Sequence, residues 1–131
     1  MTGLIQNRHW LLRLALASVF IFHGVGKFVG PGGVAGFADM MGLPFVVALL
    51  VCLAEVAAGV GILVGGFGRP LISRLSGLAV IPVMLGAIVM VHWGQWSFVA
   101  SETHPMGGME FQVVLMLIAG WFALGGGHAE A

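Results

Sequence analysis

Long runs of apolar residues alternate with short glycine- and proline-rich breaks along this chain of 131 residues. The runs are continuous and do not alternate with period two, so they predict helices and argue against a membrane β-barrel. Four of them approach the roughly 20 residues that a helix needs to cross a hydrocarbon core about 30 Å thick. The predicted spans are residues 10–28, 44–64, 75–92 and 110–124.

The connections between these runs carry helix-breaking residues and interfacial side chains. Residues 30–33 (Gly-Pro-Gly-Gly) end the first run, and residues 34–41 present one apolar face, which predicts a short interfacial helix. Pro44 suits the first turn of the second span, where a missing N–H is not needed. The third connection, residues 93–109, contains two tryptophans, which are typical of the membrane–water boundary.

The basic residues predict the orientation of the four spans. Arg8, Arg13, Arg69 and Arg74 fall on one side of the predicted topology, and Lys27 falls on the other. Because basic loops stay in the cytoplasm, both termini are expected there. The first run ends in Lys27 without a small-x-small cleavage site, so we interpret it as a retained span and not as a signal peptide. The prediction is an all-α, four-helix transmembrane bundle forming one domain over residues 1–131.

The composition supports a membrane protein and excludes several other classes. Hydrophobic residues make up 60% of the chain and charged residues only 8%, whereas soluble domains carry about 25% charged residues. Five Lys and Arg balance five Asp and Glu, so no basic patch exists that could bind nucleic acid. The single cysteine, Cys52, excludes an internal disulfide or a thiolate cluster. The lipid bilayer is therefore the predicted partner.

Two charges fall deep inside the predicted spans, Arg13 in the first and Glu55 in the second. Counted at 1.5 Å per residue from the outer ends of their spans, they differ by only about 6 Å in depth. An Arg13–Glu55 structural ion pair would keep both charges away from lipid. Alternatively, Glu55 is protonated, because burial disfavours the charged carboxylate, and it handles protons beside a quinone.

A second polar group gathers at the outer ends of three spans. His23 and Lys27 are four residues apart and share a helix face. His92 ends the third span and Glu110 begins the fourth, so all four side chains are expected at one depth. The sequence establishes no cofactor, but this cluster is the candidate cofactor site, and a quinone headgroup is one ligand that these side chains could bind.

Simpler or different roles remain open for the same residues. Lys27 can be a snorkelling anchor at the boundary, and His23 can bond Glu110 or a backbone carbonyl. His23 and His92 could instead be axial ligands of a b-type haem, although two histidines at one depth are a weak signal. No metal site is expected from His92, Glu102 and His104, because their spacing matches no known pattern of metal ligands.

The ordered set of these residues resembles the DoxX family, over nearly the whole chain. It comprises Arg13, the segment Phe22-His23-Gly24-Val25-Gly26-Lys27-Phe28, Gly42-Leu43-Pro44, Ala54-Glu55, Gly59, Gly65-Gly66-Phe67-Gly68-Arg69, His92, Glu110 and Gly125-Gly126-Gly127. The resemblance implies a small four-helix protein of the bacterial inner (plasma) membrane. Some members are subunits of thiosulfate:quinone oxidoreductase, and others are linked to redox-stress complexes.

Two classes of function are consistent with these residues. The favoured one is a small, non-catalytic subunit that anchors or stabilises a larger membrane redox or photosynthetic complex, packed against other membrane subunits or against itself. The alternative is a quinone-binding component of an oxidoreductase, resembling a thiosulfate:quinone oxidoreductase system. The chain has no covalent redox motif and no room for an electron-input domain, which favours the first class.

Overall fold

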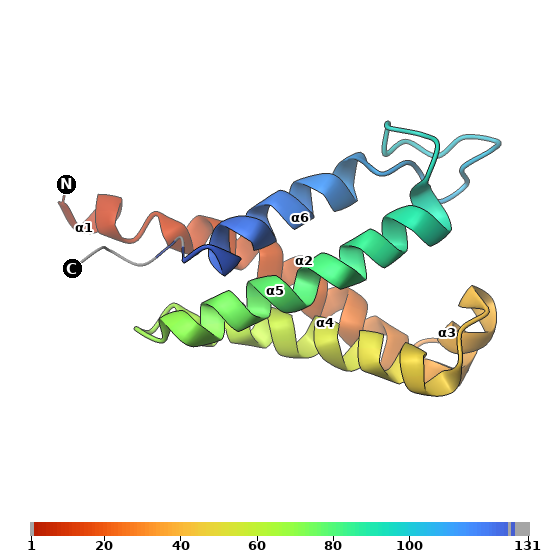
Figure 1. Cartoon of the computed structure of the whole chain (residues 1–131), viewed down its shortest axis with the longest axis horizontal. Helices are drawn as coiled ribbons and strands as arrows, with labels where there is room; N and C mark the ends of the chain where they lie inside the picture. Colours follow the sequence, from red (N-terminus) through yellow and green to blue (C-terminus); the bar gives the residue numbers. More distant parts are fainter. Residues whose placement is uncertain (1, 126, 128–131) are drawn as a thin grey trace.

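The structure, a computed structural model that describes residues 2–125 and 127, is built from helices, with no strand in that part of the chain (Figure 1). The all-α prediction is therefore confirmed. The elements in order are α1 (Thr2–Gln6), α2 (His9–Val29), α3 (Gly33–Met41), α4 (Phe45–Gly65), α5 (Pro70–Ala87), the π-helical turn η1 (Ile88–His92) and α6 (Glu110–Ala123).

Three of the helical segments are long and apolar enough to cross a membrane: α2, α4, and α5 continued by η1. The third begins at Pro70, before the predicted start at residue 75, because proline is well suited to the first turn of a helix. The segment predicted as the fourth span forms α6, a helix of 14 residues. At 1.5 Å per residue α6 is about 21 Å long, which is shorter than the hydrocarbon core.

Consecutive long helices pack side by side, α2 on α4, α4 on α5 and α5 on α6, while α3 packs on α4 and α2. The helices converge at the end where α1 and the α4–α5 turn lie, which we call the α1 end (Figure 1). At the opposite end, α4 with α3 diverges from α5 and residues 93–109. We call this the α3 end.

The hydrophobic core joins the four long helices. Glycines let these helices approach closely, because a Cβ atom at Gly59 would lie 3.1 Å from the backbone nitrogen of Ile21, and one at Gly77 would meet the α6 backbone. The core side chains are Leu16, Phe20, Ala58, Ile62, Val80, Met84, Leu115, Ala119 and Phe122.

Candidate functional site

Arg13 lies at the α1 end, completely buried, and is hydrogen-bonded to neutral groups. Its Nη1 donates to the carbonyl oxygen of Ile62 at 2.5 Å and to the Ser73 hydroxyl at 2.8 Å. Its Nε donates to His9 Nδ1 at 3.0 Å. The predicted Arg13–Glu55 pair is therefore corrected: Arg13 connects α2, α4 and α5 through neutral acceptors, and Glu55 bonds elsewhere.

The register between α2 and α4 explains this correction. A Cβ atom at Gly24 would lie 3.1 Å from Glu55 Cβ, so Glu55 lies beside Gly24. Gly24 is about 16 Å along α2 from Arg13, at 1.5 Å per residue. The depth estimate from sequence assumed that the outer ends of the two spans are level. Instead, the connection through α3 lets the first turns of α4 extend beyond the end of α2, by about 7.5 Å on the same scale.

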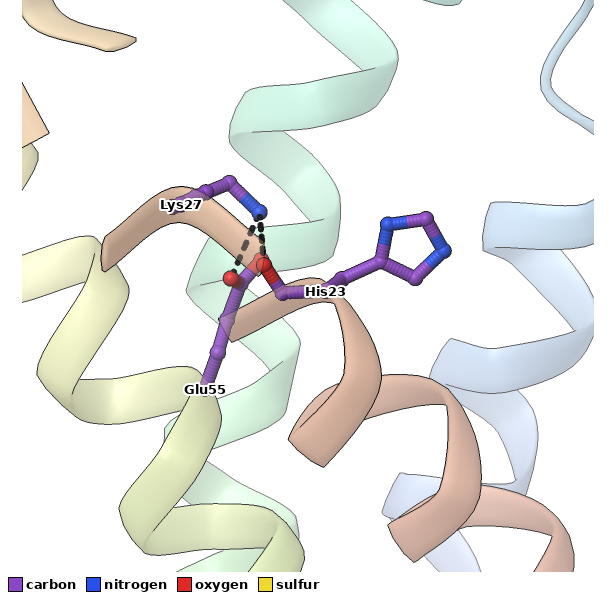
Figure 2. A network of polar contacts seen from close by, with 3 residues as sticks. All are labelled: His23, Lys27 and Glu55. Atoms are coloured by element: carbon purple, nitrogen blue, oxygen red, sulfur yellow. Dashed lines mark hydrogen bonds and ion pairs between the residues drawn. The ribbon is translucent and has the colours of Figure 1, made fainter. Parts of the chain in front are cut away.

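Glu55 forms its ion pair with Lys27, at 2.6 Å between Nζ and Oε2 (Figure 2). The side chains are 19% and 6% exposed, so the pair is largely shielded within the protein. The Lys27 ammonium also donates to the carbonyl oxygen of His23 at 3.4 Å and lies 5.2 Å from the centre of the Phe37 ring. The imidazole of His23 points away from the ion pair (Figure 2). Pairing neutralises two charges that would be costly in hydrocarbon.

His92 occupies the last position of the π-helical turn and is fixed by two hydrogen bonds. Its Nδ1 lies 2.8 Å from the carbonyl oxygen of Gly107, and its Nε2 lies 3.0 Å from Gln112 Nε2. A carbonyl oxygen only accepts, so Nδ1 carries the proton, and Nε2 of the neutral ring accepts from the Gln112 amide. Both ring nitrogens are thus engaged in hydrogen bonds that connect η1, the loop at Gly107 and α6.

These polar groups line one cavity of about 670 Å³ between the diverging helices. Its walls come from every element between α2 and α6, and most of the lining side chains are apolar. Such a cavity, apolar with a few converging polar groups, is typical of small-molecule sites. The polar and charged side chains that line it are His23, Lys27, Glu55, His92 and Gln112.

The predicted outer cluster is thus rearranged. His23, Lys27 and His92 line the cavity, but Glu110 is not among the lining residues; it begins α6, where its backbone N–H donates to the Trp96 carbonyl. Gln112 was missed, although a lone amide in an apolar helix is a signal that sequence can offer.

The cavity carries no net charge along its described wall, because Lys27 and Glu55 are its only charged lining residues and they neutralise each other. Within the described residues, no group of three or more His, Cys, Asp or Glu side chains is placed to hold a metal ion. The site is therefore suited to a neutral ligand with polar atoms. An anionic ligand such as a phosphate or a carboxylate is disfavoured, because Lys27 is already paired with Glu55.

The apolar helices and the cavity between them define a small α-helical membrane protein with a candidate site between its helices. The DoxX family profile matches residues 9–93, and the chain belongs to the DoxX family. A curated relative from Bacillus subtilis (strain 168), named "Putative oxidoreductase CatD", is 30% identical over 116 residues, which cover 88% of this chain and 77% of that protein. No solved structure matches the chain significantly.

Proposed function

We propose that this protein is a quinone-binding component of a membrane oxidoreductase system, with the quinone headgroup in the cavity beside Lys27 and Glu55. The observation that carries the proposal is a cavity without net charge, lined by the Lys27–Glu55 ion pair and by the hydrogen-bonded His92. A quinone headgroup is uncharged and presents polar oxygens on an otherwise apolar ring, which fits such a site.

Lys27 supplies a hydrogen-bond donor for a quinone carbonyl. An ammonium group has three N–H donors, and among the described residues Lys27 uses two of them, on Glu55 and on the His23 carbonyl. The third is free for an acceptor-only atom such as a carbonyl oxygen. The same cation would stabilise negative charge that develops on that oxygen during reduction.

Gln112 supplies the complementary acceptor. Its Oε1 is buried and has no hydrogen-bond partner among the described residues, while its Nε2 donates to His92. A buried polar atom without a partner costs about 1–3 kcal/mol, and a hydroxyl donor on the ligand would relieve that cost after a small rotation of the amide. The cavity wall thus provides one free donor, on Lys27, and one free acceptor, on Gln112. This pair suits a quinone, whose oxygens interconvert between carbonyl and hydroxyl.

Glu55 and His92 are the groups that would hold or move protons. When bound, a quinone supplies the acceptor of two electrons and two protons. Lys27 Nζ would orient one oxygen, and the Glu55 carboxylate, 2.6 Å from Nζ, would be positioned to exchange a proton there. His92 Nε2 would become a second exchange position if the ligand displaces the Gln112 amide.

The membrane placement belongs to the same proposal. We infer that α6 is the fourth span, that both termini are cytoplasmic, and that the α3 end faces away from the cytoplasm in the bacterial inner membrane. The basic residues favour this orientation. The name of the Bacillus subtilis relative supports an oxidoreductase role without specifying a substrate.

Titration of the purified protein with decylubiquinone tests the proposal, and extraction of ubiquinone or menaquinone from the preparation gives an independent measurement. The double variant Lys27→Met/Glu55→Gln keeps the net charge of the cavity at zero and removes the donor, so we expect it to bind quinone about tenfold more weakly. Glu102→Gln is the matched control, because Glu102 is exposed and lies outside the cavity lining.

Two results would overturn the proposal. One is a wild-type protein that carries no extractable quinone and binds decylubiquinone no better than empty micelles do. The other is equal binding by the wild type and the double variant. The role of an anchoring subunit in a larger complex stays a prediction, and isolation in mild detergent with a stoichiometric partner would test it separately.

A further inference from the structure

A second, smaller cavity of about 300 Å³ adjoins the polar one at the α3 end. No polar side chain lines it, and four of its six lining residues are methionines. Five of the six also line the polar cavity, so the two spaces lie side by side and share most of the wall of the smaller one. The lining residues are Met40, Met41, Met90, Val91, Pro105 and Met106.

The methionines of this passage are not packed as core residues. Met40, Met90 and Met106 are 68%, 50% and 64% exposed, although they belong to three separate elements. Methionine side chains are flexible and polarisable, and they adapt to apolar ligands of irregular shape. They come from α3, η1 and residues 93–109, and together they place an apolar, methionine-lined space directly beside the polar cavity.

We propose that this methionine passage holds the apolar tail of an amphiphilic ligand whose headgroup occupies the polar cavity. The inference rests on the proposed quinone function and identifies the class of quinone: one with an alkyl or isoprenoid tail. The tail leaves between α3 and η1. Its first carbons contact the four methionines, and the remainder extends into the bilayer.

The charges and the packing support this direction for the tail. Lys27, Glu55, His92 and Gln112 hold the polar half of the ligand in the larger cavity. The route toward the α1 end is closed by the hydrophobic core, in which Phe20 and Phe122 are 1% and 0% exposed. An apolar chain attached to the headgroup therefore leaves through the methionine passage, which presents thioethers and no polar side chain.

Blocking the passage tests the proposal with two probes that share one headgroup. Decylubiquinone carries a ten-carbon tail, and 2,3-dimethoxy-5-methyl-1,4-benzoquinone carries none. In Pro105→Trp, at the lining residue that belongs to the smaller cavity alone, the larger side chain should weaken decylubiquinone binding about tenfold, because it fills the space that the tail would occupy. Binding of the tail-less quinone should stay within about twofold of the wild type. Leu50→Trp is the control, since Leu50 is exposed on α4 and lines neither cavity.

The outcomes separate this inference from the function on which it rests. If the tail-less quinone binds but Pro105→Trp weakens both probes equally, or weakens neither, the tail passage is wrong and the headgroup site stands. If neither probe binds the wild type, the quinone function falls and the passage falls with it. A decylubiquinone analogue with a diazirine on the first carbons of its tail adds a measurement on unmodified protein: photolabelling should fall on peptides containing Met90 or Met106, and labelling confined to α6 would contradict the proposal.

Discussion

Helix α2 carries a buried cation at each end of the bundle, and the two are held in opposite ways. Arg13 at the α1 end is fully buried, bonded to a carbonyl and to neutral side chains, and lies 4.8 Å from the Phe122 ring centre. Lys27 at the α3 end is paired with a carboxylate and faces a cavity. One cation is surrounded by packed protein, and the other borders a space that a ligand can enter.

The difference between these two cations distinguishes a structural role for Arg13 from a candidate ligand-binding role for Lys27. Five N–H donors let a guanidinium connect three helices at once, which suits a structural joint. An ammonium is a compact charge with three rotatable donors, and it can keep one for a ligand while the carboxylate neutralises it. Intramembrane charge alone does not mark a binding site. What distinguishes Lys27 as part of a candidate site is the cavity that it lines.

Replacing Arg13 should give the largest loss of stability. We expect Arg13→Ala to lower the free energy of unfolding by about 3 kcal/mol, because hydrogen bonds from a charged donor contribute about 1.5–3 kcal/mol each. Denaturant unfolding in a fixed detergent measures this, with Arg69→Ala, an exposed arginine at the α4–α5 turn, as the control. If Arg13→Ala left the stability unchanged but abolished quinone binding, Arg13 would belong to the ligand site and not to the scaffold.

Replacing Lys27 alone should cost about 2 kcal/mol, since Lys27→Met leaves the buried Glu55 carboxylate without its cation. The double variant Lys27→Met/Glu55→Gln should recover more than half of that loss, because no uncompensated charge remains. A double-mutant cycle on the unfolding free energy measures the coupling. Additive losses would show that the ion pair contributes nothing to folding.

A pair of glycine substitutions tests the register that keeps the two charged regions apart. A Cβ atom at Gly24 would lie 3.0 Å from the Val56 backbone nitrogen, whereas one at Gly26 would meet nothing within 4 Å. Gly24→Ala should therefore destabilise the protein by about 1–2 kcal/mol, and Gly26→Ala should stabilise it by about 0.5–1 kcal/mol. Thermal unfolding of both variants checks this, and equal effects would contradict the α2–α4 register.

Loss of the Gln112 amide should have the smallest effect on stability. Gln112→Leu removes the hydrogen bond to His92 Nε2, at a cost of about 1 kcal/mol. Nitrogen NMR of the imidazole provides the sharper measurement: the wild type should show the proton on Nδ1, and the variant should show a mixture of both tautomers. A wild-type ring protonated on Nε2 alone would exclude the bond to the Gly107 carbonyl.

Helix positions could be predicted from the sequence because apolar runs and proline or glycine breaks are local signals. α4 begins one residue from the predicted start, and the short helix α3 lies where its apolar face was recognised. The partner of Glu55 could not be predicted by the same means. It depends on how far α4 slides along α2, which is set by side-chain contacts such as that of Gly24 with Val56.

The sequence predicted only part of the candidate site, because it gives the depth of a side chain but not the direction in which that side chain points. His23, Lys27 and His92 are polar residues near the ends of apolar runs, and counting along the helices places them at one depth. Glu110 met the same criterion, yet it lies outside the cavity lining, because depth does not determine the direction in which a side chain points. The methionine passage left no distinct sequence signal, since its residues come from three separate segments.

The π-helical turn of residues Ile88–His92 has a consequence for comparisons among relatives. A π turn accommodates one residue more than an α-helical turn, and such insertions occur frequently at functional positions. Deleting one residue from η1 would restore an ordinary α-helix and rotate the residues after the deletion by about 100°, turning the imidazole away from Gln112. In a relative with a one-residue gap at η1, we therefore expect the imidazole to point away from the position that His92 occupies in this chain.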